Sequence, residues 1–173
     1  MKTLVLGKDQ FKKDGCYNEY IGTEDLSDFQ GHLEIEADLG WTLFAHIRVS
    51  GYILAKSGSG ISAGEGISAG DGISAGSGIS AGWGISAGSG ISAGWGISAG
   101  DGISAGEGIS AGDGISAGLT IICKKVLKFR FQIFAGVCRW KKTNDEDKKI
   151  QCLRLEGGEV AYGILEESKK ENK

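Results

Sequence analysis

The side chains best suited to binding chemistry stand at one position of a repeated six-residue unit. The unit Gly-Ile-Ser-Ala-Gly occurs ten times between residues 60 and 118, and one variable residue separates each copy from the next. Seven of the variable residues are aromatic or acidic: Trp83, Trp95, Glu65, Asp71, Asp101, Glu107 and Asp113. An exposed tryptophan places an apolar ring in water, and such residues are enriched in binding hot spots. These seven are therefore the candidate binding residues.

The five carboxylates of this set have two interpretations. They could form a negative face that imitates the phosphates of a nucleic acid or attracts cations. Alternatively, they keep a surface of Gly, Ala and Ser soluble, which is the simpler interpretation. Calcium sites of the repeat-toxin kind carry Asp inside a GGxGxD unit, and the array lacks that unit.

A basic segment follows the array. Residues 124–154 contain ten basic and three acidic residues, whereas residues 1–123 contain six basic and fourteen acidic ones. The members of interest are Lys124, Lys125, Lys128, Arg130, Arg139, Trp140, Lys141 and Lys142. They could contact a phosphate backbone, cover the end of the fold, or dock onto the acidic body of another copy. Because the pI of the chain is ≈ 5.5, we favour an end cap and expect no direct binding of nucleic acid.

Residues for catalysis or metal binding are scarce. The two histidines, His32 and His46, precede the array on segments that resemble strands. The sequence contains no phosphate-binding loop, no nucleophile–base pair and no metal-ligand cluster. The cysteines are Cys16, Cys123, Cys138 and Cys152. Their wide spacing is typical of reduced thiols, although the last three could pair if their strands are neighbours. We expect no catalysis, no cofactor and no bound metal.

The repeat unit predicts a very short strand followed by a corner. Ile and Ala lie two residues apart, so an extended backbone points both to one side and Ser to the other. Two glycines in every six residues exclude a helix, since each costs about 1 kcal/mol relative to alanine. In the Gly-x-Gly corner, glycine would supply positive φ angles at little cost. The array therefore predicts a β-solenoid around a core of Ile and Ala.

Two or three units could complete one coil of the solenoid. With three units, the variable residues stack in the columns Glu65–Trp83–Asp101, Asp71–Ser89–Glu107 and Ser59–Ser77–Trp95–Asp113. No two carboxylates are then neighbours on coils about 4.8 Å apart, whereas a two-unit coil places Asp101 beside Asp113. The sequence therefore favours about 18 residues per coil. A bundle of glycine-rich extended helices is the alternative, because Gly or Ala recurs at every third residue.

The flanking segments complete a single all-β domain. We predict an N-terminal cap segment over residues 1–30, the solenoid over 31–123, a basic C-terminal cap with a small antiparallel sheet over 124–165, and a charged tail over 166–173. Within the cap, residues 153–160 predict a hairpin that turns at Gly157-Gly158. The amino terminus lacks the apolar stretch of a signal peptide, and no run is long enough to span a membrane. We therefore expect a cytoplasmic location.

The chain from Gly31 through the repeats, in which Gly51-Tyr52-Ile53-Leu54-Ala55 leads into the array, resembles bactofilin-type β-helices in its rhythm. That resemblance implies a non-enzymatic protein that polymerises end to end. The array also looks like uncharacterised glycine-rich repeat proteins of phages and mobile elements. Hexapeptide-repeat acyltransferases share its period. Their inward-pointing small residue, two places before the aliphatic one, is replaced here by residues such as Glu65 and Trp83.

These features predict a non-catalytic β-solenoid that acts as a scaffold or binds a macromolecule through its corner residues. Its partner would be another protein or further copies of itself, without membrane contact. A second hypothesis is a phage-type intracellular inhibitor, whose acidic face and tryptophans block a nucleic-acid-binding defence protein of the host. A third is an acyltransferase with His32 or His46 as general base.

Overall fold

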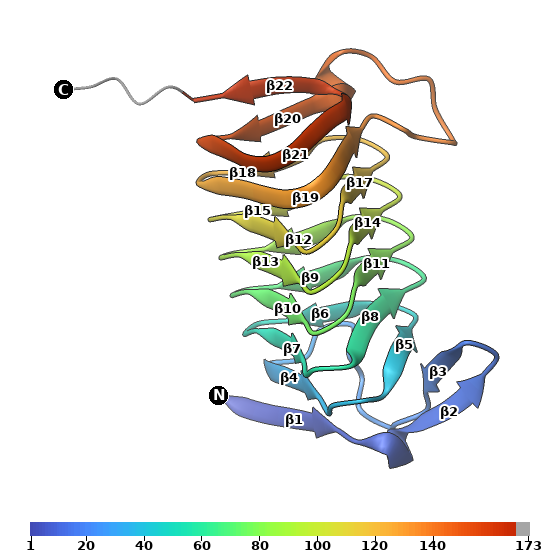
Figure 1. Ribbon diagram of the computed structural model, residues 1–173. Coiled ribbons are helices and arrows are strands. Elements are labelled where there is room, and N and C mark those ends of the chain that lie inside the picture. Colours follow the sequence, from blue (N-terminus) through green and yellow to red (C-terminus); the bar gives the residue numbers. More distant parts are fainter. Residues whose placement is uncertain (169–173) are drawn as a thin grey trace.

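The computed structural model describes residues 1–168, which fold into a β-solenoid of about eight coils (Figure 1). The first unit of the array belongs to the five-residue strand β8 (Ser59–Ala63), each later unit contributes one three-residue strand, Ile-Ser-Ala, and three strands complete a coil. Strand β10 (Ile73–Ala75) pairs in parallel with β13 (Ile91–Ala93), in the register Ile73↔Ile91. The predicted all-β solenoid, with about 18 residues per coil, is therefore confirmed.

Three parallel ladders of strands form the three faces of the solenoid. Face 1 contains β1 (Lys2–Leu6), β4 (Gly31–Ile35), β7 (Ile53–Ala55), β10, β13 and β16 (Ile109–Ala111). Face 2 contains β5 (Gly40–Phe44), β8 (Ser59–Ala63), β11 (Ile79–Ala81), β14 (Ile97–Ala99) and β17 (Ile115–Ala117). Face 3 contains β6 (Ile47–Val49), β9 (Ile67–Ala69), β12 (Ile85–Ala87), β15 (Ile103–Ala105) and β18 (Ile121–Cys123). We call the edges between them corner 1/2, corner 2/3 and corner 3/1.

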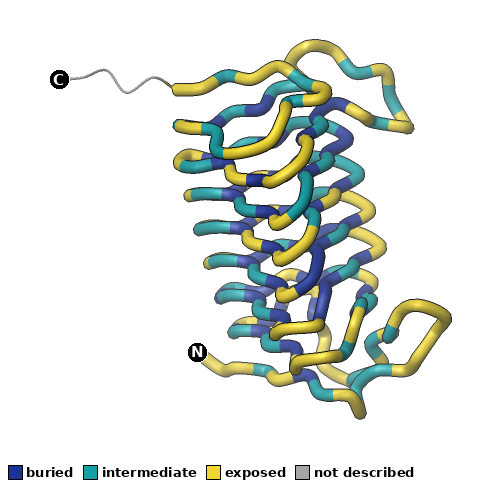
Figure 2. The backbone as a smooth tube through the Cα atoms, in the orientation of Figure 1, coloured by how far each residue is buried: buried dark blue, intermediate teal, exposed yellow. Residues whose placement is uncertain are grey.

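The interior of the solenoid is a stack of Ile and Ala side chains. In the ten units of the array, Ile is at most 2% exposed and Ala at most 5%. Ser lies between them and points outward, so buried positions alternate with less buried ones along each coil (Figure 2). Burying one Ile side chain contributes about 1.5–3 kcal/mol, which makes this column the main source of stability in the array.

The glycines of the array are required by the close approach of adjacent coils. A Cβ on Gly88, which ends a unit, would collide with the carbonyl oxygen of Gly70 in the preceding coil. Positive φ angles at glycine occur at Gly15, Gly40, Gly58, Gly136, Gly157 and Gly163, all outside the array. The predicted positive φ angles at the corners are therefore wrong. The corners turn with ordinary φ angles, and glycine is needed there because a side chain would have no room.

The N-terminal segment adds strands to two faces. β1 pairs in parallel with β4 and so extends face 1. After the 3-10 helix η1 (Lys8–Gln10), β2 (Phe11–Asp14) and β3 (Tyr17–Tyr20) form an antiparallel hairpin. Strand β3 then pairs in parallel with β5 at the start of face 2. The hairpin lies at the same end of the molecule as β1 (Figure 1).

The C-terminal segment continues the coils in parallel. The long strand β19 (Val126–Ala135) bends from face 1 to face 2, and β21 (Arg154–Tyr162) follows it in parallel. On face 3, β20 (Lys149–Cys152) pairs in parallel with β18, and β22 (Ile164–Glu167) pairs in parallel with β20. The predicted C-terminal strands are present, but their predicted antiparallel pairing is wrong.

The predicted hairpin turn at Gly157-Gly158 is also wrong. Both glycines lie inside β21, with Gly157 opposite Phe129 of β19. A Cβ on Gly157 would collide with the carbonyl oxygen of Phe129, so the two glycines allow β21 to follow the bend of β19 closely. In the predicted tail, residues 166 and 167 belong to β22, and residues 169–173 lie outside the described part of the chain. No helix within residues 1–168 is long and apolar enough to cross a membrane.

Candidate binding surface at the corners

The variable residues stack in three columns, one along each corner. At corner 2/3, the Trp83 N–H donates to the Glu65 carbonyl (3.1 Å), and the Asp101 N–H donates to the Trp83 carbonyl (3.2 Å). At corner 1/2, the Trp95 N–H donates to the Ser77 carbonyl (3.1 Å). Corner 3/1 carries Asp71, Ser89 and Glu107, again one per coil. The three predicted columns are therefore confirmed.

The two tryptophans lie on different corners and share one arrangement. Trp83 is 57% exposed and Trp95 is 55% exposed, although both belong to the most regular part of the fold. An aspartate follows each tryptophan one coil later: Asp101 after Trp83, and Asp113 after Trp95. The structure thus brings each tryptophan together with a carboxylate, but it does not bring the two tryptophans together.

The five carboxylates are distributed over all three corners and do not form one continuous acidic face. Nζ of Lys125 lies 2.6 Å from a carboxylate oxygen of Glu107, and Nδ1 of His46 lies 3.7 Å from one of Glu65. Both carboxylates are about half exposed, and exposed ion pairs contribute little to stability. Within residues 1–168, Asp71, Asp101 and Asp113 take part in no ion pair. These three remain available to a ligand.

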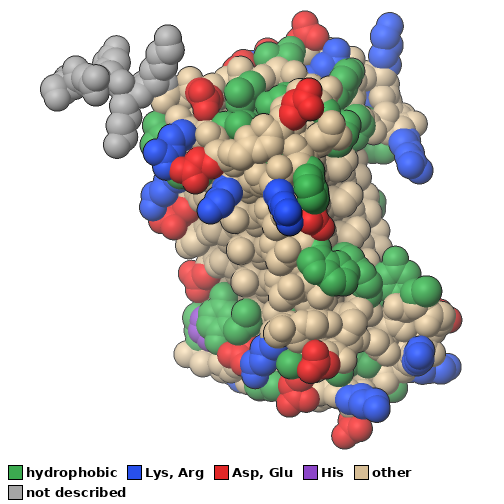
Figure 3. Space-filling model, in the orientation of Figure 1, with side chains coloured by type: hydrophobic (Ala, Val, Ile, Leu, Met, Phe, Trp, Pro, Cys, Tyr) green, Lys and Arg blue, Asp and Glu red, His purple; other side chains and the backbone are tan. Residues whose placement is uncertain are grey.

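The basic segment is spread over the C-terminal end of the solenoid. Lys124 and Lys125 follow β18, and Lys128 and Arg130 point outward from β19. The remaining members (Arg139, Trp140, Lys141 and Lys142) belong to residues 136–148, a segment that projects beyond the stack of coils (Figure 1). Figure 3 shows charged side chains toward both ends of the molecule and few in its middle. The basic residues are thus spread over the end of β18, over β19 and over the projecting segment.

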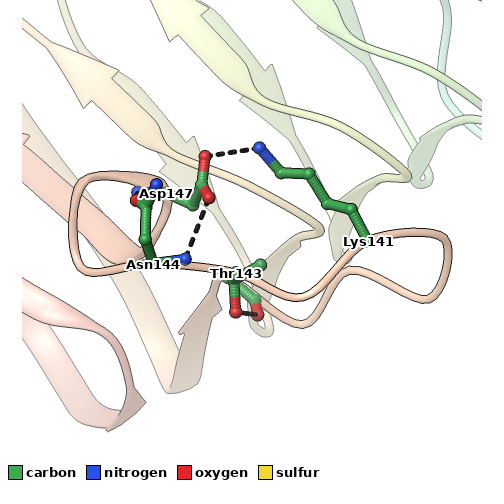
Figure 4. Close-up of polar contacts among 5 residues, drawn as sticks. Lys141, Thr143, Asn144 and Asp147 are labelled. Atoms are coloured by element: carbon green, nitrogen blue, oxygen red, sulfur yellow. Dashed lines mark hydrogen bonds and ion pairs between the residues drawn. The ribbon is translucent and has the colours of Figure 1, made fainter.

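The projecting segment is held in shape by polar contacts. Nζ of Lys141 donates to Asp147 (2.8 Å), the Asn144 N–H donates to the same carboxylate (3.0 Å), and the Thr143 hydroxyl donates to the Gly136 carbonyl (3.1 Å) (Figure 4). The hydrogen bond from Lys141 holds the pKa of the Asp147 carboxyl below its ordinary value. The 3-10 helix η2 (Glu146–Lys148) then leads into β20. Trp140, 65% exposed, is displayed on this segment.

The histidines lie on different faces of the solenoid, and His32 has structural contacts. Nδ1 of His32, in β4 on face 1, accepts the Tyr52 N–H (3.1 Å), and the His32 ring stacks on the Tyr52 ring with centroids 4.2 Å apart. His46 precedes β6 on face 3, beside Glu65. Within the described chain, no group of three or more His, Cys, Asp or Glu side chains could hold a metal ion.

The buried cysteines are neighbours without being bonded. Cys123 ends β18 and Cys152 ends β20, at adjacent positions of the parallel ladder, and both thiols are free. Burial raises the pKa of the Cys123 thiol, and it raises that of Cys152 to about 11, with a further contribution from Cys123. The thiols are therefore protonated at neutral pH and poor nucleophiles. Cys16 is exposed and Cys138 is half-buried.

Each face carries a shallow groove over the glycines that begin its units, a feature that the sequence analysis missed. The groove on face 2, which we call the face-2 groove, has a volume of about 530 Å³. Its lining includes Trp41, Trp95, Asp113, Gln132, Phe134 and three outward serines. Trp41 and Phe134 come from outside the array, where the spacing departs from six residues. Their alignment with Trp95 therefore depends on the strand register, for which the sequence offers no direct signal.

The grooves of faces 1 and 3 differ in charge from the face-2 groove. On face 3, the groove (about 540 Å³) is lined by His46, Arg48, Trp83 and Asp101. On face 1, the groove (about 700 Å³) is lined by Tyr52, Leu54 and the serines of β10, β13 and β16, with Lys128 at its end.

No protein-family model, curated protein or solved structure matches the chain. The geometry alone therefore carries any functional argument.

Proposed function

We propose that this protein is a non-catalytic scaffold that binds a macromolecule through its corner residues. The observation that carries the proposal is the exposure of Trp83 and Trp95, each more than half exposed on a frame of small side chains. Large aromatic rings of this kind contribute strongly to binding when a partner covers them. The bactofilin-type resemblance of the array agrees with such a role.

The rigidity of the frame supports a scaffold. The strands that carry the corner residues are hydrogen-bonded in parallel to a strand on either side, as β11 is to β8 and β14. A tryptophan at such a corner keeps its position without a partner, so that binding orders little else in the protein.

The proposal is tested by measuring particle mass with light scattering after size-exclusion chromatography. The test variant is Trp83→Ser/Trp95→Ser, because serine occupies the same corner position at Ser77 and Ser89 and the fold should be retained. If the partner is another copy, we expect a defined oligomer or filament for the wild type and smaller species for the variant. Trp140→Ser, which removes an exposed tryptophan outside the corners, is the control and should assemble like the wild type.

A monomeric wild type directs the test to a foreign partner. In that case, cross-linking of the wild type and of the variant in a cell lysate compares what each captures. We expect a partner that the wild type and Trp140→Ser capture and that the double variant loses. Equal assembly and equal capture by all three proteins would overturn the proposal.

A further inference from the structure

The face-2 groove combines flat aromatic walls with a floor of bare backbone. The Trp41 ring covers the first glycines of the row, since a Cβ on Gly78 would lie 2.7 Å from its Cη2 atom. Further along the row, Gly96 and Gly114, which carry no side chains, line the groove together with Trp95. Phe134, which pairs with Ser116 in the ladder, bounds the far end. The groove is therefore closed at both ends by rings and open along its middle.

The same groove presents polar groups that the protein itself does not use. Ser80, Ser98 and Ser116 stand in a row on successive strands, about 4.8 Å apart. Asp113 and Gln132 line the side of the groove. Within residues 1–168, none of these five side chains has a hydrogen bond or ion pair to another residue. Together, hydroxyl, amide and carboxylate groups can donate hydrogen bonds to a ligand and accept hydrogen bonds from it.

The charge of the face-2 groove restricts the kinds of ligand that could bind in it. Among residues 1–168, no Lys, Arg or His lines the face-2 groove, and Asp113 gives it a negative group, so phosphate-bearing ligands are disfavoured. Among the lining residues within 1–168, Asp113 is the one charged side chain, and a single carboxylate supplies too few oxygen ligands for a cation site. A neutral ligand with many hydroxyls fits best, because carboxylate–hydroxyl hydrogen bonds are charge-assisted.

We infer that the face-2 groove binds a neutral oligosaccharide, with Trp95 stacking on the C–H face of one sugar ring. The hydroxyls of the sugar would bond to Asp113, Ser98 and Ser116. Three serine rungs span about 10 Å, which suits a short oligosaccharide. The inference rests on the proposed function, for which it names the ligand at corner 1/2.

The test uses the full chain on a printed array of neutral and sulfated glycans, followed by titration calorimetry with the neutral oligosaccharides that bind. We expect at least one neutral oligosaccharide to bind. Trp95→Ser and Asp113→Asn should each lower its affinity about tenfold or more, as the loss of a stacked ring or of a charge-assisted hydrogen bond requires. Trp140→Ser, which removes an exposed ring from the projecting segment 136–148, is the control and should bind like the wild type.

Three outcomes would overturn the inference: no glycan binds, only sulfated glycans bind, or Trp140→Ser and Trp95→Ser lose affinity equally. Far-UV circular dichroism of each variant separates a lost contact from a lost fold. Failure here is distinct from failure of the proposed function. A wild type that assembles through its tryptophans but binds no sugar contradicts only the oligosaccharide, and Asp113→Asn should leave assembly unchanged.

Discussion

At the scale of the residue, the corner glycines show how one atom can decide the fold. Gly88 and Gly90 flank the same variable residue, yet their surroundings differ. A Cβ on Gly88 would collide with the backbone of the preceding coil, whereas a Cβ on Gly90 would lie 3.3 Å from the Gly108 carbonyl oxygen, a distance that a small shift relieves. The two glycines are therefore not equivalent, although they are identical in the repeat.

We predict that Gly88→Ala destabilises the protein much more than Gly90→Ala. The first substitution forces two coils apart, at a cost of about 2 kcal/mol or more, while the second should cost about 1 kcal/mol or less. Urea unfolding followed by circular dichroism measures both. Equal midpoints for the two variants would show that the coils can separate without loss, contrary to the packing described above.

At the scale of the element, the buried core and the columns of corner residues could be predicted from the sequence, but the φ angles of the corners and the strand pairing at the ends could not. The Ile-Ser-Ala alternation specifies which side chain is buried, and the charges at the corners select the three-unit coil. Gly157-Gly158 misled because a glycine pair serves equally in a hairpin turn and where two strands bend together. The sequence did not predict that Trp41 lines a groove, because its place over the array depends on the pairing of β5 with β8.

The C-terminal coil provides a test at pH values above neutral. Burial raises the pKa of Cys152 to about 11, so the folded protein keeps this proton at a pH where the unfolded chain has lost it. The stability that this thiol contributes is complete below pH about 8.5 and is lost as the pH rises toward 11. In Cys152→Ala, β20 ends with alanine, as the face-3 strands β9, β12 and β15 do. Between these pH values, the melting temperature of this variant should fall less than that of the wild type.

Thermal melts of three proteins decide this point. Cys16→Ala, which removes an exposed thiol from the N-terminal hairpin, should follow the wild type. If Cys152→Ala loses as much melting temperature as the wild type on going to alkaline pH, the buried thiol is not the group responsible.

At the scale of the whole molecule, each six-residue unit forms one third of a coil, whichever face it occupies. All three faces use the same Ile-Ser-Ala strand, so the removal of residues 85–90 should rotate the C-terminal end by a third of a turn and preserve every pairing type. The removal of residues 88–90 alone should instead place inward residues outward in the coils that follow. We predict a cooperative melt near that of the wild type for the six-residue deletion and a large loss of stability for the three-residue deletion.

Circular dichroism melts of both deletions test the equivalence of the faces. A six-residue deletion as damaging as the three-residue one would mean that the coils depend on which face each unit occupies.

The uniformity of the strands has a consequence for recognition. Along one face of the array, the outward side chain is the same serine at every coil. The strands therefore cannot select one binding position for a partner. Position is marked only by the variable residues, of which two are tryptophan, and by the unique flanks. The corner residues therefore determine where along the otherwise uniform array a partner can bind. Exchanging Trp95 with Ser77 would move that binding position by one coil and leave the strands unchanged.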